Sequence, residues 1–306
     1  MTIPSISDKK ILVTGGAGFI GSHIVDALID DNEIIVLDNF SSGDRVNIPS
    51  SAKVIEGDIL NSNVVAEAME DIDIVFHQAA LVSVNKSVKN PVSSHNINVC
   101  ATLNILENAR NEDARVVMAS SCAIYGQPSE IPIPESAALN PSSPYGLDKA
   151  AIDQYARIYH ELYGLETVAL RYFNVFGPRQ QGGEYSGVIS IFVDQARTGG
   201  PITIDGNGTQ TRDFIHVNDV VRANLLAATT DQVGEAFNVG TGTQTSIKSL
   251  AEIIKDIIDS KVNIVHRDPR SGDIECSEAD TRKASSQLDF ESEISLKEGL
   301  KQFLKK

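Results

Sequence analysis

A glycine-rich segment directly after the first apolar run constrains the fold more than any other feature of the chain. Residues 14–21 read TGGAGFIG, between a β-branched run at 10–14 and an amphipathic stretch at 22–31. Gly15, Gly18 and Gly21 permit a tight turn, close approach of the backbone to a pyrophosphate, and close packing of a helix on a strand. Because strand, glycine turn and helix follow in this order, the segment predicts a dinucleotide-binding fold rather than an ordinary turn.

An acidic residue ends the second predicted strand. This strand, at 33–37, runs into Asp38, 17 residues after Gly21. A carboxylate at this place can accept hydrogen bonds from both ribose hydroxyls of NAD and repels the 2′-phosphate of NADP. The residues from Asn39 to Gly43 include no arginine that would reverse this preference. The sequence therefore predicts NAD as the cofactor.

The first half of the chain alternates β-branched runs with amphipathic stretches, which is the pattern of βαβ units. After residue 171 this rhythm breaks, and the glycine-rich segments 177–187 and 199–213 predict loops over a smaller lobe, with one strand at 235–240 returning to the sheet. The predicted fold class is α/β, a doubly wound Rossmann parallel sheet with a smaller α/β substrate lobe. The Rossmann domain is expected at 1–175 and the substrate domain, interleaved with it, at 176–306. Further strands are expected at 53–56, 72–77, 115–120 and 167–171, and helices at 63–70, 91–111 and 145–163.

The charge balance restricts the possible partners. There are 26 Lys and Arg against 41 Asp and Glu, a formal charge of −15, so the general field repels nucleic acid and anionic membranes, and neither is expected as a partner. An anionic ligand must therefore meet a local cationic pocket. Cys100, Cys122 and Cys276 have neither disulfide nor metal-site spacing, so no metal is expected. The N-terminal segment lacks the apolar core of a signal peptide, which predicts a cytoplasmic protein.

Three residues form a candidate catalytic group. Tyr145 and Lys149 are four apart on a predicted helix and share a face, and Ser121 ends a predicted strand. An ammonium beside a phenol is expected to lower the pKa of the phenol, which can then move a proton while nicotinamide takes a hydride. The spacing alone is more typical of a surface pair than of a catalytic one, and it is the upstream cofactor motif that favours catalysis. His77 is expected to be a packing or hydrogen-bonding residue, and Cys122 a core thiol.

The motifs together resemble the nucleotide-sugar branch of the extended short-chain dehydrogenase/reductase family, over nearly the whole chain. They are TGGAGFIGS, Asp38, GDI at 57–59, FHQAA at 76–80, the Ser121, Tyr145 and Lys149 group, RYFNVFGP at 171–178 and RDFIHVNDV at 212–220. The resemblance implies cofactor contacts at Gly15, Gly18, Phe19, Ile20, Gly21, Asp38, Asn39, Ser41, Ser42, Gly43, Asp58, Ile59, Ala79, Ala80, Asn98, Ser120, Tyr145, Lys149 and Tyr172. It implies substrate contacts at Ser121, Tyr145, Asn174, Val188, Thr203, Arg212, Arg270, Asp273 and Ser277, the two arginines holding phosphates.

The residues after Ser121 discriminate between reactions in this branch. Cys122 and Ala123 cannot act as the carboxyl acid or base that a sugar dehydratase needs. The resemblance then implies NAD-dependent 4-epimerisation of a UDP-hexose through a 4-keto intermediate. A small residue at Ser277 implies room for an N-acetyl group, so that UDP-N-acetylhexosamines are also expected as substrates. Alternatives are a UDP-glucuronate epimerase, a dTDP-sugar enzyme and, in a different class, a non-catalytic NAD-binding sensor.

The resemblance also implies an assembly. In the family, the helices that correspond to 91–111 and 145–163 pair with those of a second subunit in a four-helix interface. A homodimer is therefore expected.

Overall fold

The computed structural model describes residues 5–180, 187–258, 261–269, 272 and 274–304 of the chain. Its centre is a seven-stranded parallel sheet with the strand order β11-β6-β5-β4-β1-β2-β3. The chain crosses over between β3 and β4, so β1 and β4 are adjacent at a topological switch point, where open α/β sheets bind ligands. The predicted fold class is confirmed. The strands are β1 (Lys10–Thr14), β2 (Glu33–Asp38), β3 (Lys53–Glu56), β4 (Ile74–His77), β5 (Arg115–Ser121), β6 (Thr167–Tyr172) and β11 (Glu235–Val239).

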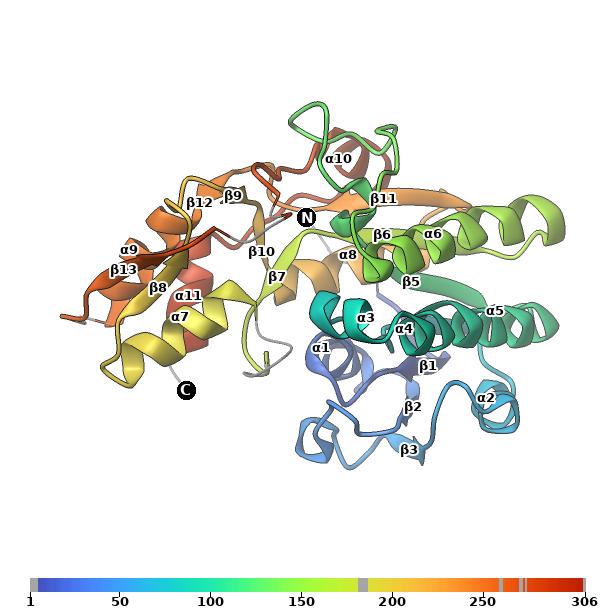
Figure 1. Cartoon of the computed structure of the whole chain (residues 1–306). Coiled ribbons are helices and arrows are strands. Elements are labelled where there is room, and N and C mark those ends of the chain that lie inside the picture. The colour runs from blue at the N-terminus through green and yellow to red at the C-terminus, as the bar shows by residue number, and fades with distance from the viewer. Residues whose placement is uncertain (1–4, 181–186, 259–260, 270–271, 273, 305–306) are drawn as a thin grey trace.

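Helices cover both faces of this sheet (Figure 1). One apolar core joins the sheet to α1 (Phe19–Leu28), α8 (Val217–Thr229) and α10 (Arg282–Leu288). The other joins it to α2 (Ser62–Met69), α5 (Ala101–Glu112) and α6 (Pro144–Tyr163). Since both faces are buried, the strands are apolar along most of their length, as parallel strands require.

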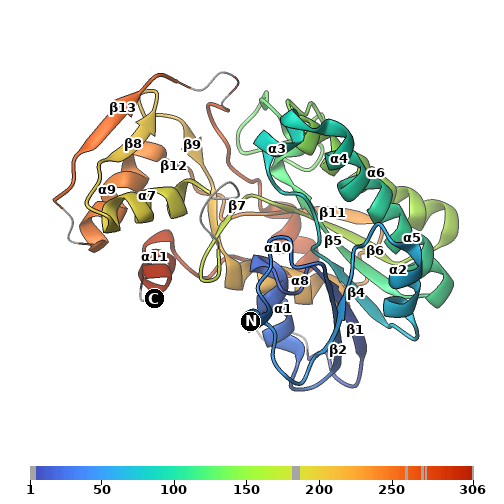
Figure 2. The same cartoon turned by 60° about the horizontal axis from the view of Figure 1, so that its bottom comes forward.

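The second lobe packs around its own core. Figure 2 shows α7 (Val188–Arg197), α9 (Ile247–Ile258) and α11 (Leu296–Leu304) on one side of the molecule, away from the large sheet. Their apolar faces pack on β8 (Ile202–Asp205), which pairs in parallel with β13 (Ile264–Arg267). Two further strand pairs are β7 (Asn174–Phe176) with β10 (Phe214–His216) and β9 (Thr211–Arg212) with β12 (Thr245–Ser246).

Most predicted elements are confirmed within a few residues; β1 and β3 begin and end where expected, and β11 ends one residue before the predicted end. Helix α1 begins at Phe19 instead of residue 22, because the glycine turn ends at Gly18, whose extended backbone caps the helix. The predicted helix 91–111 is a continuous run of α4 (Pro91–His95), the π-helical turn η2 (Asn96–Cys100) and α5.

Several elements were not predicted from the sequence, among them the helices α7 to α11. The segment 199–213, predicted as a loop, contains β8 and β9, because Ile202 and Ile204 alternate into the core of the second lobe. A short helix, α3 (Val84–Lys89), precedes α4. The division of the chain near residue 175 stays a prediction. Three elements from beyond this point belong to the first lobe in space: β11 completes the large sheet, and α8 and α10 pack on it. Within the described ranges, none of the helices has the length and apolar character of a membrane span.

Candidate functional site

The glycine turn lies at the carboxyl edge of the sheet, against the loop that follows β4. Gly15 has φ +68°, and a Cβ there would lie 2.8 Å from the backbone nitrogen of Ala79. A Cβ at Gly21 would collide with the carbonyl oxygen of Gly15. Gly18, which caps α1, makes no side-chain capping bond, and the first turn of α1 holds no acidic residue. The first turn therefore leaves backbone donors and a positive dipole end for a pyrophosphate.

Asp38 is buried beside this turn. Its carboxylate accepts hydrogen bonds from the backbone nitrogens of Ala17 (2.9 Å) and Phe40 (2.8 Å). The segment that follows returns to the glycine turn, since a Cβ at Gly43 would lie 2.6 Å from that of Ala17. The nearby Arg45 is paired with Glu56 at 2.6 Å. The pocket thus presents a carboxylate where an adenosine ribose would lie, and the residues present fit NAD.

Other predicted cofactor residues line the same edge. The carboxylate of Asp58, which precedes Ile59, accepts a hydrogen bond from the Asn39 side chain at 3.1 Å. The backbone nitrogen of Ser41, next to Ser42, donates to the side chain of Asn39 at 3.0 Å. These contacts connect the loops after β2 and β3, while the roles of the individual residues toward NAD stay predictions.

His77 connects the glycine turn to the π-helical turn through a chain of buried hydrogen bonds. Thr102 donates its only hydroxyl proton to the carbonyl of Asn98 (2.6 Å), so it must accept from Nε2 of His77 (2.9 Å). Nδ1 then accepts from the hydroxyl of Thr14 (2.7 Å), which in turn accepts from the backbone nitrogen of Ala79 (3.3 Å). Burial lowers the pKa of His77 to about 3. His77 is therefore a neutral hydrogen-bonding residue, as predicted.

Asn98 holds the loop after Ala80. Its side-chain oxygen accepts from the backbone nitrogen of Leu81 at 2.8 Å, and its amide nitrogen donates to the carbonyl of the same residue at 3.2 Å. Asn98 is almost completely buried. The structure thus gives it a supporting role toward the cofactor loop.

Helix α6 brings Tyr145 and Lys149 to the end of β5. Ser143 caps the helix by accepting from the backbone nitrogen of Gly146 at 3.1 Å. The Ser121 hydroxyl lies close enough to Tyr145 to act on the pKa of its phenol. The ammonium of Lys149 donates to the carbonyl of Ala119 at 2.7 Å. The three predicted catalytic residues therefore come together.

The electrostatics differ from the expectation. Burial raises the pKa of Tyr145 to about 12, and the nearby Ser121 hydroxyl acts in the opposite direction without cancelling this shift. Burial also lowers the pKa of Lys149 to about 8, against the nearby charge of Asp148. The predicted lowering of the Tyr145 pKa by Lys149 is wrong in this structure, because desolvation of the phenolate outweighs the effect of its neighbours.

The second lobe brings further predicted residues to the catalytic serine. Ser277 is buried and lies next to the thiol of Cys122, the residue after Ser121. The charge of Arg212 also acts on Cys122, and its guanidinium donates to the carbonyl of Ile274 at 2.6 Å. Burial raises the pKa of the Cys122 thiol to about 12, which makes it a poor nucleophile and a poor acid.

The remaining predicted residues are placed less directly. Asn174 donates from its side chain to the carbonyl of Asp213 at 3.1 Å, while Val188 begins α7 and Thr203 lies on β8. Arg270 and Asp273 lie outside the described residues.

Two predicted cofactor residues have hydroxyl groups that are already bonded within the protein. Ser120 donates to Asp153 at 2.8 Å. The hydroxyl of Tyr172 accepts from Asn224 at 2.9 Å and contacts Gln78. Asp153 and Thr14 were missed from the sequence. The position of Asp153, four residues after Lys149 on the same helix face, is the signal that could have found it.

Comparisons with known proteins agree over almost the whole chain. Residues 11–240 match the model of the NAD dependent epimerase/dehydratase family. A relative named putative UDP-glucose 4-epimerase, from Methanocaldococcus jannaschii, is 45% identical over 95% of this chain and 96% of its own. The structure of a UDP-N-acetylglucosamine 4-epimerase from Methanobrevibacter ruminantium in complex with UDP-N-acetylmuramic acid superposes with a TM-score of 0.95 at 39% identity, over 98% of each chain. That of a Thermotoga maritima UDP-glucose 4-epimerase with UDP-glucose gives a TM-score of 0.94 at 39% identity, over 97% of each chain.

Proposed function

The chain belongs to the NAD dependent epimerase/dehydratase family, and from this premise we propose that it inverts C4 of UDP-hexoses with NAD as its cofactor. The observation that carries the proposal is the contact between Ser121, at the end of β5, and Tyr145 on α6. Lys149 lies on the same face of α6 as Tyr145. These are the groups that a reversible oxidation of a sugar alcohol needs. The enzyme is an isomerase of the extended short-chain dehydrogenase/reductase type.

The protein's own residues move the proton and hold the substrate. NAD bound at the glycine turn would supply the hydride acceptor for oxidation at C4 and the hydride donor for its reversal. Tyr145 accepts the proton of the C4 hydroxyl, and Ser121 donates to the phenolate oxygen and steadies the developing charge. Lys149 is held at the end of β5 by its hydrogen bond to the carbonyl of Ala119 and supplies the cationic charge of the buried site. The diphosphate stays bound in the second lobe while the 4-keto sugar turns.

The same geometry disfavours elimination of water. A dehydratase needs a proton donor and a base beside the catalytic serine. At this place the chain has Ala123 and the Cys122 thiol, whose pKa of about 12 leaves it protonated and weakly acidic. The reaction therefore ends with return of the hydride rather than loss of a hydroxyl.

The substrates follow from the second lobe. Arg212 faces the catalytic end of β5 and supplies the cation that a diphosphate requires in this acidic protein. The small, buried Ser277 leaves room beside the sugar. We therefore infer that UDP-glucose and UDP-galactose are interconverted, and that the UDP-N-acetylhexosamine pair is accepted as well. Relatives of both specificities have related structures.

A homodimer is the proposed assembly, and the cytoplasm the proposed location. Helix α6 contacts both η2 and α5, and it exposes Leu147 and Leu162 near its two ends. Apolar side chains on adjacent exposed helices favour pairing with the same surface of a second copy. Sedimentation velocity at micromolar concentration is expected to give the mass of a dimer, and a monomer alone would contradict this assignment.

The activity can be tested directly. The purified protein is incubated with a panel of UDP- and dTDP-sugars in the presence of NAD, and the 4-epimers are separated by chromatography. We expect interconversion of the UDP-hexoses. If none of the sugars in the panel is converted to its 4-epimer, the proposed function is refuted.

A further inference from the structure

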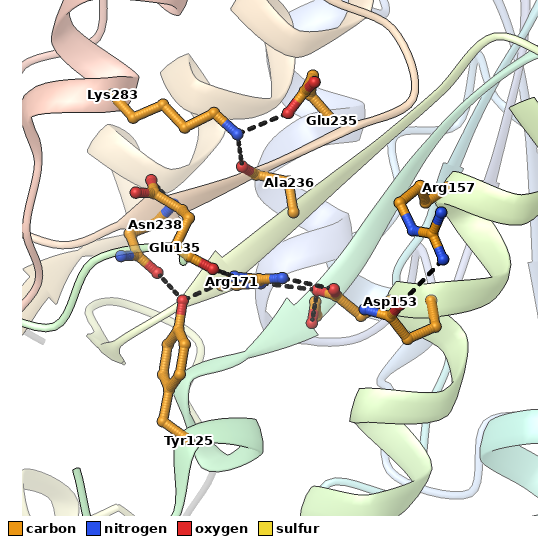
Figure 3. A network of polar contacts seen from close by, with 11 residues as sticks. Tyr125, Glu135, Asp153, Arg157, Arg171, Glu235, Ala236, Asn238 and Lys283 are labelled. Carbon is orange, nitrogen blue, oxygen red and sulfur yellow. Dashed lines mark hydrogen bonds and ion pairs between the residues drawn. The ribbon is translucent and has the colours of Figure 1, made fainter. Parts of the chain in front are cut away.

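A buried ion pair lies beneath the catalytic residues, between α6 and β6. The guanidinium of Arg171 binds the carboxylate of Asp153 through two hydrogen bonds, of 2.9 Å from Nε and 2.7 Å from Nη2 (Figure 3). The two side chains are 6% and 1% exposed. Removing two charges from water costs more free energy than their attraction returns unless the geometry is good and the other lone pairs are satisfied. We therefore expect this ion pair to contribute little net free energy of folding and to act mainly by fixing the relative positions of α6 and β6.

The carboxylate of Asp153 also binds the strand that carries the catalytic serine. Ser120 donates its hydroxyl proton to Oδ2 of Asp153 at 2.8 Å. One helical turn earlier, Lys149 donates to the carbonyl of Ala119 at 2.7 Å. Helix α6 is therefore attached to β5 at the two residues immediately before Ser121. Tyr145, Lys149 and Asp153 follow at intervals of four residues and lie on one face of this helix.

Arg171 holds the chain on the other side of Ser121. Its Nη1 donates to the hydroxyl of Tyr125 at 2.9 Å and to the carbonyl of Glu135 at 2.8 Å. The hydroxyl of Tyr125 donates a hydrogen bond of 2.7 Å to the side-chain oxygen of Asn238 on β11 (Figure 3). Tyr125 ends the 3-10 turn η3 (Cys122–Tyr125) that follows Ser121. The ion pair thus holds the backbone both before and after the catalytic serine.

We propose that Asp153 and Arg171 are positioning residues of the catalytic site, which set the register of α6 against β5 so that the Ser121 hydroxyl reaches Tyr145. The inference rests on the proposed function and adds the device that aligns its two proton-handling groups. Neither residue touches the substrate in this role. Displacing a reacting group by about 1 Å can cost on the order of 100-fold in rate, so a small change of register matters.

The sharpest test removes one hydrogen bond. Ser120→Ala leaves the ion pair in place and detaches β5 from Asp153. We expect kcat with UDP-glucose to fall about 10- to 100-fold, while KM and the NAD content of the purified protein stay within about twofold. The pH at which the rate reaches its plateau should also rise, because Ser121 no longer lowers the pKa of Tyr145. An unchanged kcat and pH profile would overturn the inference.

A second variant separates positioning from folding. Asp153→Leu combined with Arg171→Met replaces the pair by apolar side chains, which buried ion pairs generally tolerate without loss of stability. We expect a folded protein with native NAD content and the same fall in kcat as Ser120→Ala. A folded double variant with unchanged kcat would also overturn the inference.

Chemical rescue offers an independent readout. Arg171 and Asp153 border a pocket of about 590 Å³ together with residues such as Arg157 and Lys283, so the space vacated in an Arg171→Ala variant would adjoin this pocket. We expect Arg171→Ala to lose activity and millimolar guanidinium to restore part of kcat, at least fivefold over the variant alone. Equal concentrations of ammonium, which lacks the planar fork, should restore less. Restoration by both ions alike, or by neither, would contradict a positioning role for Arg171.

A matched control lies at the opposite end of the same strands. Glu166→Gln breaks the exposed ion pair with Arg115, at 2.6 Å, where β5 begins. It should leave kcat and the pH profile unchanged. The wild-type protein is assayed alongside: if it converts none of the UDP-sugars, the proposed function fails, whereas active wild-type protein with unaffected variants refutes only the inference.

Discussion

The ammonium of Lys149 donates a hydrogen bond of 2.7 Å to the carbonyl of Ala119, two residues before Ser121. Lys149 is buried, and burial lowers its pKa to about 8. The contact fastens the catalytic helix to the end of a central strand. The same residue therefore contributes both charge and position to the site, in contrast to the purely electrostatic role that its spacing from Tyr145 predicts.

Removal of the Tyr145 hydroxyl is expected to stop catalysis and leave binding intact. Tyr145→Phe deletes the proton acceptor but keeps the ring, so turnover should fall by about 1,000-fold or more. Calorimetry should give a Kd for UDP-glucose close to that of the wild type, because the residues proposed to hold the nucleotide, such as Arg212, lie in the second lobe and are unchanged. Retained turnover would refute the assignment of Tyr145, and loss of binding as well would point to a structural role.

Replacement of Asp38 is expected to weaken NAD and reduce its preference over NADP. Asp38→Ala removes the carboxylate that is predicted to bind the ribose, and hydrogen bonds to a charged group contribute about 1.5 to 3 kcal/mol each. The Kd for NAD should rise at least about tenfold, while the Kd for NADP changes less because the repulsion of its 2′-phosphate is lost. Fluorescence titration of the cofactor-free protein measures both. Asp44→Ala, at the cap of a nearby short helix, is the control.

A bulky residue at position 277 is expected to separate the two substrate classes. Ser277 lies against Cys122 beside the catalytic serine. Ser277→Tyr fills this space, so epimerisation of UDP-N-acetylglucosamine should be lost while that of UDP-glucose persists. Rates on both substrates are measured by chromatography of the products. Equal loss of both activities would contradict the proposed sugar pocket, and Ser277→Ala should preserve both.

The folded protein is expected to lose stability in mild acid because of His77. Burial lowers its pKa from 6.5 to about 3, so between these values the unfolded chain binds a proton that the folded chain does not. The contribution is complete above pH 6.5 and is lost as the pH falls toward 3, at up to about 1.4 kcal/mol per pH unit. Urea unfolding at pH 7.5 and 4.5 measures this, with a smaller difference expected for His77→Gln. An identical difference in both proteins would contradict it.

The sequence predicted those parts of the site that depend on short-range spacing. The glycine turn, Asp38 after the second strand, and the pair Tyr145 and Lys149 each follow from residues a few positions apart in one element. Helix and strand periods place such residues on one face or at one end of an element before any tertiary structure is known. The resemblance of the motifs added Ser277 and Arg212, which no local pattern assigns.

Contacts between distant segments could not be predicted in the same way. Asp153 and Arg171 belong to different elements, and the hydrogen-bond chain through His77 joins residues from 14 to 102. Strand β8 was missed because its apolar alternation is short and lies between glycines, and β9 because its two residues are polar and pair with the distant strand β12. The burial of Ile202 and Ile204 on β8 depends on packing against α7 and the distant α9.

The sequence by itself determined the order of strands and helices in the first half of the chain, the parallel sheet, the glycine turn and the candidate proton-handling residues, because these depend on local periodicity and on chemical type. Only the tertiary structure decided the direction of the Tyr145 pKa and the attachment of α6 to β5. Both depend on how completely a group is removed from water and on which distant partner it meets. Burial and contacts between distant residues exist only in the folded chain, so neither can be predicted from local sequence.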